Sequence, residues 1–124
     1  MLASRNRQFA LAVGVLWIVL GVLGLVLAPE GLLFGVLTVG LGQNVIHLFG
    51  GALLVAAALV GLRSARAVNL VVGTAALGLG MVGLFTSGTE ANVLALNGAG
   101  NIVHFGTATL LLIASLGTDR PARG

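Results

Sequence analysis

Charged residues are scarce in this 124-residue sequence, and their placement constrains the fold more than any other feature. The chain carries six arginines, three acidic residues and no lysine. These leave charge-free stretches at 8–29, 31–62, 67–89 and 91–118. A helix needs roughly 20 mostly apolar residues to cross about 30 Å of hydrocarbon. Each stretch therefore predicts one membrane span, and the longest is too short for two spans with a turn.

The overall composition excludes three broad classes of protein. Apolar residues make up 58% of the chain and charged residues 7%, against about 45–50% and about 25% in soluble domains. A soluble globular domain and a disordered chain are therefore excluded. The net charge is +3. No nucleic-acid partner is predicted, because the arginines form separated pairs rather than the contiguous basic face that nucleic-acid binding needs.

We predict an all-α integral membrane four-helix bundle that forms a single domain. Its spans are expected at about 9–28, 41–62, 67–85 and 98–117. The second span starts at Leu41 or Asn44, and the fourth starts at Gly98 or Asn101. Residues 63–66 are expected to form a short connector between the second and third spans.

The charges also predict how the chain is oriented in the membrane. The arginines lie in three pairs, at Arg5 and Arg7, Arg63 and Arg66, and Arg120 and Arg123. With four spans, all three pairs fall on one side, and Glu30 and Glu90 fall on the other. Positive residues in short loops stay cytoplasmic, so both termini are expected in the cytoplasm. We expect a multi-pass protein of the bacterial inner membrane.

The two outward segments, 31–40 and 91–96, are apolar for loops. Backbone that is not helical cannot face lipid, because its polar groups find no hydrogen-bond partner there. The segments are therefore expected to be short interfacial helices or caps folded over the mouth of the bundle. The simpler interpretation is that they extend the second and fourth spans outward.

The two halves of the chain match as tandem repeats, over about 7–62 and 66–118. Three glycines recur with identical spacing at an offset of 59 residues, namely Gly14, Gly21 and Gly24 with Gly73, Gly80 and Gly83. An Asn-x-x-His motif recurs at an offset of 57 residues, in which Asn44 and His47 match Asn101 and His104. Both units begin on the cytoplasmic side, which predicts two parallel-repeat helical hairpins related by a pseudo-twofold axis along the membrane normal.

The six repeated glycines share one face of their helices. Such a stripe lets another helix backbone approach closely, which matters in lipid because hydrophobic burial does not drive helices together there. We predict that the stripes serve tight packing within the chain. Homodimerisation through one stripe is the alternative.

The two histidines are the only titratable side chains inside the apolar stretches. Each has an asparagine three residues earlier, on the same helix face. An ionisable residue inside a membrane is a functional hypothesis by default. One alternative is that Asn44 and Asn101 cap their helices, with His47 and His104 in the first turn near water. Another alternative is that a neutral histidine forms a hydrogen bond with an asparagine on a neighbouring helix, which would stabilise the helix packing by roughly 1 kcal/mol.

A sharper hypothesis is that His47 and His104 hold a b-type haem, as facing histidines do in four-helix bundles. Gly50, Gly51 and Gly106 would leave room for the porphyrin. Zinc is disfavoured, because two histidines with asparagine make a poor tetrahedral set. No cofactor is expected in our leading interpretation.

With these motifs in hand, the sequence resembles a bacterial family of small four-span membrane proteins described as domain of unknown function 4383. The resemblance covers about 9–116. It rests on Gly14 with Gly21-x-x-Gly24, on Asn44-x-x-His47-x-x-Gly50, and on Asn101-x-x-His104. The second unit departs from the motif, with Gly106 and Thr107 where the first has Phe49 and Gly50. The resemblance implies a four-helix integral membrane fold and supplies no activity, substrate or cofactor.

We expect a protein without catalysis of its own, with a structural or interaction role in the lipid bilayer. It would be an accessory subunit of a larger membrane complex, or it would associate with itself. The haem redox protein is one alternative. The other is a binder of lipid or another apolar ligand, in which the apolar segments 32–39 and 93–96 close a cavity in the bundle.

Overall fold

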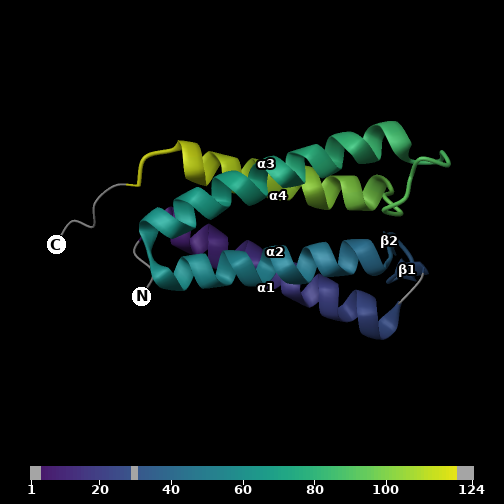
Figure 1. Ribbon diagram of the computed structural model, residues 1–124, viewed down its shortest axis with the longest axis horizontal. Coiled ribbons are helices and arrows are strands. Elements are labelled where there is room, and N and C mark those ends of the chain that lie inside the picture. Colours follow the sequence, from purple (N-terminus) through teal and green to yellow (C-terminus); the bar gives the residue numbers. More distant parts are fainter. Residues whose placement is uncertain (1–3, 29–30, 120–124) are drawn as a thin grey trace.

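The computed structural model describes residues 4–28 and 31–119. It contains four helices, α1 (Arg5–Leu27), α2 (Leu41–Val60), α3 (Leu62–Thr86) and α4 (Gly98–Leu116). Each helix is long and apolar enough to cross a membrane. The prediction of an all-α four-helix membrane fold is therefore confirmed (Figure 1).

The helices are arranged as two antiparallel hairpins. α1 packs mainly along α2, and α3 packs mainly along α4, with fewer contacts between the hairpins. The junction of α2 and α3 is the single residue Gly61, whose φ of 152° and ψ of −177° suit glycine. The expected connector at 63–66 is therefore helical. Arg63 and Arg66 lie in the first turns of α3.

The glycine stripes hold the two helices of each hairpin close together. Gly14 and Gly21 lie against α2, where a Cβ added at Gly14 would come within 2.9 Å of the Gly51 carbonyl oxygen. Gly73 lies against α4 in the same way, with Leu111 Cβ 3.1 Å from such a Cβ. All six repeated glycines are buried inside the hairpins. None is left on the surface for homodimerisation, so that alternative is wrong for these stripes.

Contacts at equivalent positions support the predicted internal repeat, which stays a prediction. Leu48 fills the space at Gly21, and Phe105, its counterpart 57 residues later, fills the space at Gly80. The arginines behave alike as well. Arg7 Nε donates to the Ala58 carbonyl at 2.7 Å, and Arg66 Nε donates to the Ser115 carbonyl at 2.8 Å. Each guanidinium thus satisfies a carbonyl in the last turn of the partner helix, where no intrahelical donor remains.

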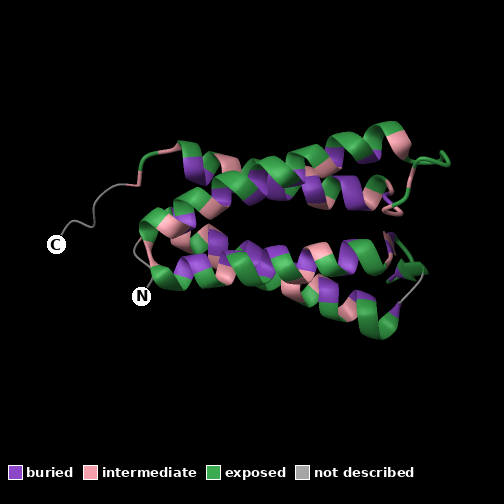
Figure 2. Cartoon of the chain, in the orientation of Figure 1, coloured by how far each residue is buried: buried purple, intermediate pink, exposed green. Residues whose placement is uncertain are grey.

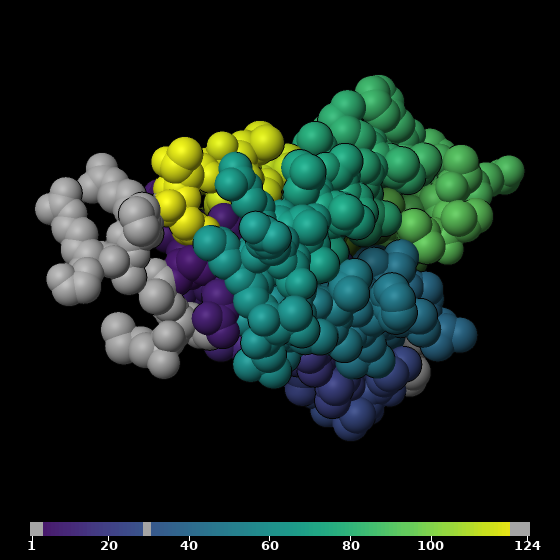
Figure 3. Space-filling model, turned by 60° about the vertical axis from the view of Figure 1, so that its left-hand side comes forward, coloured from purple at the N-terminus to yellow at the C-terminus, as the bar shows by residue number. Residues whose placement is uncertain are grey.

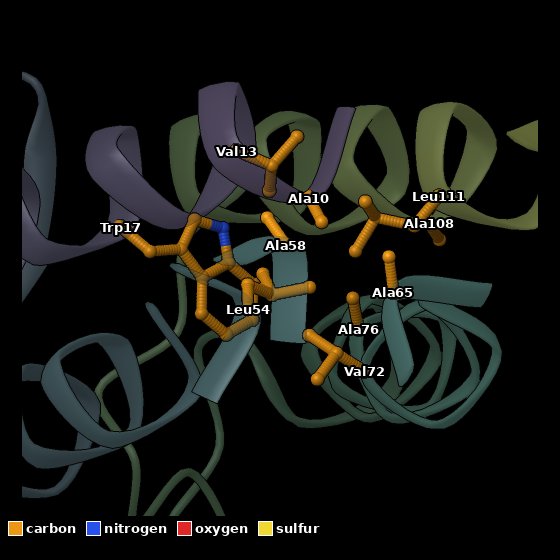
Figure 4. Close-up of a cluster of buried hydrophobic side chains, with 10 residues drawn as sticks. All are labelled: Ala10, Val13, Trp17, Leu54, Ala58, Ala65, Val72, Ala76, Ala108 and Leu111. Carbon is orange, nitrogen blue, oxygen red and sulfur yellow. The ribbon is translucent and has the colours of Figure 1, made fainter. Parts of the chain in front are cut away.

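Small side chains line the interface between the hairpins, and one tryptophan fills its middle. The buried core consists of Ala10, Val13, Trp17, Leu54, Ala58, Ala65, Val72, Ala76, Ala108 and Leu111. Five of these are alanine, which lets four backbones converge (Figure 4). Buried residues face the interior and exposed apolar residues face outward along all four helices (Figure 2). This is the pattern of a bundle solvated by lipid.

The segment between α1 and α2 differs from expectation, since it forms strands rather than an extension of the second span. β1 (Gly31–Leu33) pairs antiparallel with β2 (Leu37–Val39). The turn between them holds Phe34 and Gly35 at positive φ, 53° and 72°, as tight hairpin turns require. Pairing satisfies backbone groups that lipid could not.

Both outward segments fold over one end of the bundle, opposite the start of α1 and the end of α4 (Figure 1). Gln43 Nε2 holds them together, donating to the carbonyls of Thr38 at 3.0 Å, Leu94 at 2.8 Å and Ala95 at 2.8 Å. Asn97 Nδ2 adds a 2.9 Å bond to the Val36 carbonyl. The segments therefore act as a cap on the bundle, the alternative that the sequence left open.

Candidate functional site

The structure brings the two predicted histidines together in the interior, near the capped end. His47 on α2 and His104 on α4 are each 1% exposed. Their ring centroids lie 5.7 Å apart, with the ring planes tilted by 42°. The expectation that these side chains lie in a first turn near water is wrong, because both are enclosed by the bundle.

Trp17 on α1 completes this group and was missed by the sequence analysis. Its ring centroid lies 5.0 Å from that of His47 and 6.3 Å from that of His104, edge-on to both. Its indole Nε1 donates to Thr107 Oγ1 on α4 at 3.0 Å. We call Trp17, His47, His104 and Thr107 the interior cluster. The cluster joins side chains from both hairpins.

A signal for this arrangement is present in the predicted repeat. The counterpart of Trp17 in the second unit is Ala76, and the counterpart of Gly50 is Thr107. A Cβ added at Gly50 would lie 2.8 Å from the Trp17 ring. One unit therefore supplies the large side chain and the space for it, and the other supplies the hydrogen-bond acceptor. Looking for mismatches between the units would have identified the cluster.

The asparagines do not cap their helices, so the capping alternative is wrong. The N-cap residues are Gly40 for α2 and Asn97 for α4, and Asn97 Oδ1 accepts from Gly100 N at 2.9 Å. Asn44 and Asn101 are each the fourth residue of their helix. Asparagine is a favourable N-cap residue. Because Asn97 takes this role, α4 begins one turn before the start that capping by Asn101 would give.

The asparagine side chains lie instead against the glycine stripes. A Cβ added at Gly24 would overlap Asn44 Oδ1, and one added at Gly83 would overlap Asn101 Oδ1. The last glycine of each stripe therefore makes room for an asparagine rather than for an apolar side chain. This pairs the two repeated motifs, Gly with Asn, at the same place in each hairpin.

Several buried polar atoms of these residues have no hydrogen-bond partner within residues 4–28 and 31–119. They are Asn44 Oδ1 and Nδ2, His47 Nδ1 and Nε2, Asn101 Oδ1 and His104 Nδ1. The expected bond from a histidine to an asparagine on a neighbouring helix is thus not formed there. An unsatisfied buried group costs about 1–3 kcal/mol. Departures of this kind concentrate at functional sites, which keeps these residues as the candidate site.

An apolar cavity of about 220 Å³ lies beside the interior cluster, between α2 and α3. These two helices lie next to each other on the face shown in Figure 3. The cavity is lined by Trp17, Ile46, Phe49, Gly50, Leu53, Val71, Val72, Ala75 and Leu79. Neither histidine lines it, and neither outward segment closes it. It therefore differs from the ligand cavity under the caps that the sequence raised.

A comparison with known protein families identifies the family of this chain. The model of the family described as domain of unknown function 4383 matches residues 7–117. The chain belongs to this family. The resemblance read from the glycine and Asn-x-x-His motifs is thereby confirmed. No curated protein and no solved structure matches this family member.

The interior of this DUF4383-family protein does not fit a haem between the two imidazoles. A porphyrin held by both would have to occupy the place of the Trp17 indole, which lies edge-on to each ring. The glycines expected to leave room are filled: Trp17 covers Gly50, and the Gly14 carbonyl lies 2.7 Å from a Cβ added at Gly51. The space beside Gly106 is unfilled, but this glycine is exposed rather than buried in the interior.

A metal site of three or more protein ligands is likewise not formed. Among the described residues there is no group of three or more histidine, cysteine or acidic side chains that could hold an ion. The interior cluster offers two imidazoles and one hydroxyl, and the hydroxyl already accepts the indole bond. What this arrangement can do is dock one hairpin on the other at a fixed position.

Proposed function

We propose that this family member is a structural or interaction protein of the membrane, without catalysis of its own. The surface of its spans carries this proposal. Large apolar side chains are exposed on every helix, including Val26, Leu59, Phe85 and Ile113. In a bilayer such faces meet lipid tails or the helices of other membrane proteins. The role would be that of an accessory subunit, or of a self-associating bundle.

The interior of the bundle supports the same proposal, because its contacts hold one hairpin against the other. The bond from Trp17 to Thr107 and the His47–His104 contact join the two hairpins. A polar contact at a single interior place fixes one arrangement of helices among several that apolar packing would allow. The result is a bundle with a defined outer shape, which a subunit interface requires.

The test is the assembly state of the whole protein extracted from its own membrane. Chemical cross-linking in the membrane, followed by native mass spectrometry after mild extraction, is expected to show defined complexes. These would contain either further copies of the chain or other membrane subunits. If both the cross-linking and the native mass spectrometry found only monomers surrounded by lipid, the proposal would be wrong.

The proposed location is the bacterial inner membrane, with both termini in the cytoplasm. Arg5, Arg7, Arg63 and Arg66 lie at one end of the bundle, and Glu90 lies beyond α3 at the other. This distribution follows the positive-inside rule. The other charges used in the prediction, Glu30, Arg120 and Arg123, lie outside the described residues.

Cysteine labelling tests this orientation directly, because the natural chain contains no cysteine. Thr89 and Thr118 are exposed at opposite ends of the bundle. A membrane-impermeant maleimide applied to intact spheroplasts is expected to label a Thr89→Cys variant. It should label Thr118→Cys only after lysis. The reverse pattern would overturn the proposed orientation.

A further inference from the structure

A basic pocket lies at the end of the second hairpin where α3 begins and α4 ends, away from the interior cluster. It has a volume of about 400 Å³ and is lined by Arg63, Arg66, Ala67, Leu70, Ser115 and Leu116. Two of the lining residues are arginines, and no acidic side chain lines the pocket. The remaining side chains are mostly apolar. The pocket thus combines a place for negative charge with an apolar surface.

The positive charge of this pocket is not neutralised by the acidic residue nearest the same end. Asp119 is occupied elsewhere: its carboxylate accepts from Arg5 N at 2.9 Å and from Asn6 Nδ2 at 2.8 Å. Arg66 is anchored through Nε to the Ser115 carbonyl. Among residues 4–28 and 31–119, no hydrogen bond engages its Nη atoms or the Arg63 side chain. Those donors remain for a ligand.

The position of the two arginines on α3 adds to the attraction for an anion. α3 begins at Leu62, so Arg63 and Arg66 lie within its first five residues. The first backbone N–H groups of a helix lack intrahelical acceptors, and the helix dipole favours negative charge there. The residue before α3, Gly61, makes no side-chain cap.

We propose that this pocket binds the phosphate headgroup of an anionic phospholipid. The guanidinium groups would bind the phosphate oxygens through charge-assisted hydrogen bonds. The acyl chains would lie over Leu70 and Leu116, which are 44% and 71% exposed. In the proposed orientation, on which this step rests, the pocket lies at the cytoplasmic ends of the helices, where basic pockets suit such headgroups. The apolar part of the lining favours a lipid over a free anion, which would leave it uncovered.

The first hairpin lacks the same site, and this difference supplies a control. The positions matching Arg63 and Arg66 are Ser4 and Arg7. Arg7 makes the equivalent bond to the Ala58 carbonyl, but Ser4 is neutral, and its Oγ accepts from Arg7 N at 3.3 Å. The other arginine of the first hairpin, Arg5, donates from Nη2 to the Thr118 carbonyl at 3.0 Å, so the pairing of Arg63 with Arg66 is not repeated at the matching positions. Arg7→Gln removes the bond to the Ala58 carbonyl, which is equivalent to the Arg66 bond to the Ser115 carbonyl, and Arg7 does not line the pocket.

The experiment measures lipid retention by the full chain with native mass spectrometry, using phosphatidylglycerol and phosphatidylcholine as probes. The natural protein is expected to retain one phosphatidylglycerol in preference to phosphatidylcholine. Arg63→Gln and Arg66→Gln should each reduce that retention roughly fivefold, the contribution of one basic residue near an anionic surface. Arg7→Gln should leave it unchanged. Arg63→Gln breaks no described contact, so it remains informative even if Arg66→Gln fails to fold.

Two results would overturn the proposal. In the first, folded Arg63→Gln protein retains as much phosphatidylglycerol as the natural protein, so the lipid binds elsewhere. In the second, inorganic phosphate at millimolar concentration displaces the lipid completely and binds equally well without it. The pocket would then be a site for a free anion rather than for a lipid headgroup.

Discussion

The Trp17 indole nitrogen donates a 3.0 Å hydrogen bond to the Thr107 hydroxyl and so links α1 in the first hairpin to α4 in the second. Both residues are buried. Their counterparts in the predicted repeat, Ala76 and Gly50, cannot form a second copy of this bond. The two hairpins therefore meet through a contact that has no equivalent at the positions matched by the predicted repeat.

Removing the acceptor of this bond is expected to destabilise the protein. Thr107→Val keeps the shape of the side chain but leaves the indole N–H unsatisfied, a loss of about 1–3 kcal/mol in the free energy of unfolding. In a Trp17→Phe background no N–H remains, so the same change should cost much less. Unfolding by titration with sodium dodecyl sulfate measures both. Equal losses in the two backgrounds would show that the bond does not couple the hairpins.

The contact between the glycine stripe and the repeated asparagine gives a second prediction. Gly24→Ala places a Cβ on Asn44 Oδ1 and should lower the free energy of unfolding by about 1–3 kcal/mol, the usual cost of overpacking. Shortening the neighbour in an Asn44→Ala background should recover most of that loss. The same unfolding titration gives both values.

Gly78 provides the matched control for that substitution. It is exposed on α3, and nothing lies within 4 Å of a Cβ added there. Gly78→Ala should be neutral or stabilising, because alanine favours a helix over glycine by up to about 1 kcal/mol. Similar losses at Gly24 and Gly78 would point to a general effect of losing glycine and against the specific contact.

The histidine pair gives a third prediction, on stability. Replacing both imidazoles by leucine removes buried nitrogens that lack partners among the described residues and keeps a similar volume. Such double replacements are near neutral or stabilising, so His47→Leu with His104→Leu should unfold no more easily than the natural protein. His47→Ala leaves a cavity and should cost stability. A large loss in the double leucine variant would mean that the imidazoles have partners essential to the fold.

The fourth prediction concerns haem. Because the Trp17 indole occupies the place that a porphyrin between His47 and His104 would need, detergent-purified protein is expected to be colourless. The measurement is an optical spectrum, oxidised and dithionite-reduced, of protein expressed with sufficient haem. A Soret band with a sharp reduced α-band, lost in His47→Ala and in His104→Ala, would instead identify a b-type cytochrome.

Local properties of the sequence determined the class of fold. The four charge-free apolar stretches correspond to α1, α2, α3 and α4, because the length needed to cross hydrocarbon is set by the bilayer and is visible in any single segment. The glycine spacing correctly indicated close helix packing. Together with the two Asn-x-x-His motifs it also indicated the family, because motifs of this kind are short and local.

The outward segment 31–39 shows where local information was insufficient. Its apolar residues were compatible with a helix, a cap or an extended span. The strands β1 and β2 pair with each other, and Gln43 joins this pair to the segment before α4 through the carbonyls of Thr38, Leu94 and Ala95. The start of α4 likewise depended on Asn97 capping the helix one turn earlier than Asn101 would.

The sequence by itself determined four membrane helices and two Asn-x-x-His motifs within the apolar stretches. Only the tertiary structure decided what those motifs contact: Asn44 lies on Gly24, and His47 meets His104 beside Trp17. The physical reason is that membrane insertion depends on the transfer free energy of each segment alone. Docking of the hairpins depends instead on which large and small side chains coincide across them, and residues far apart in the sequence decide that together.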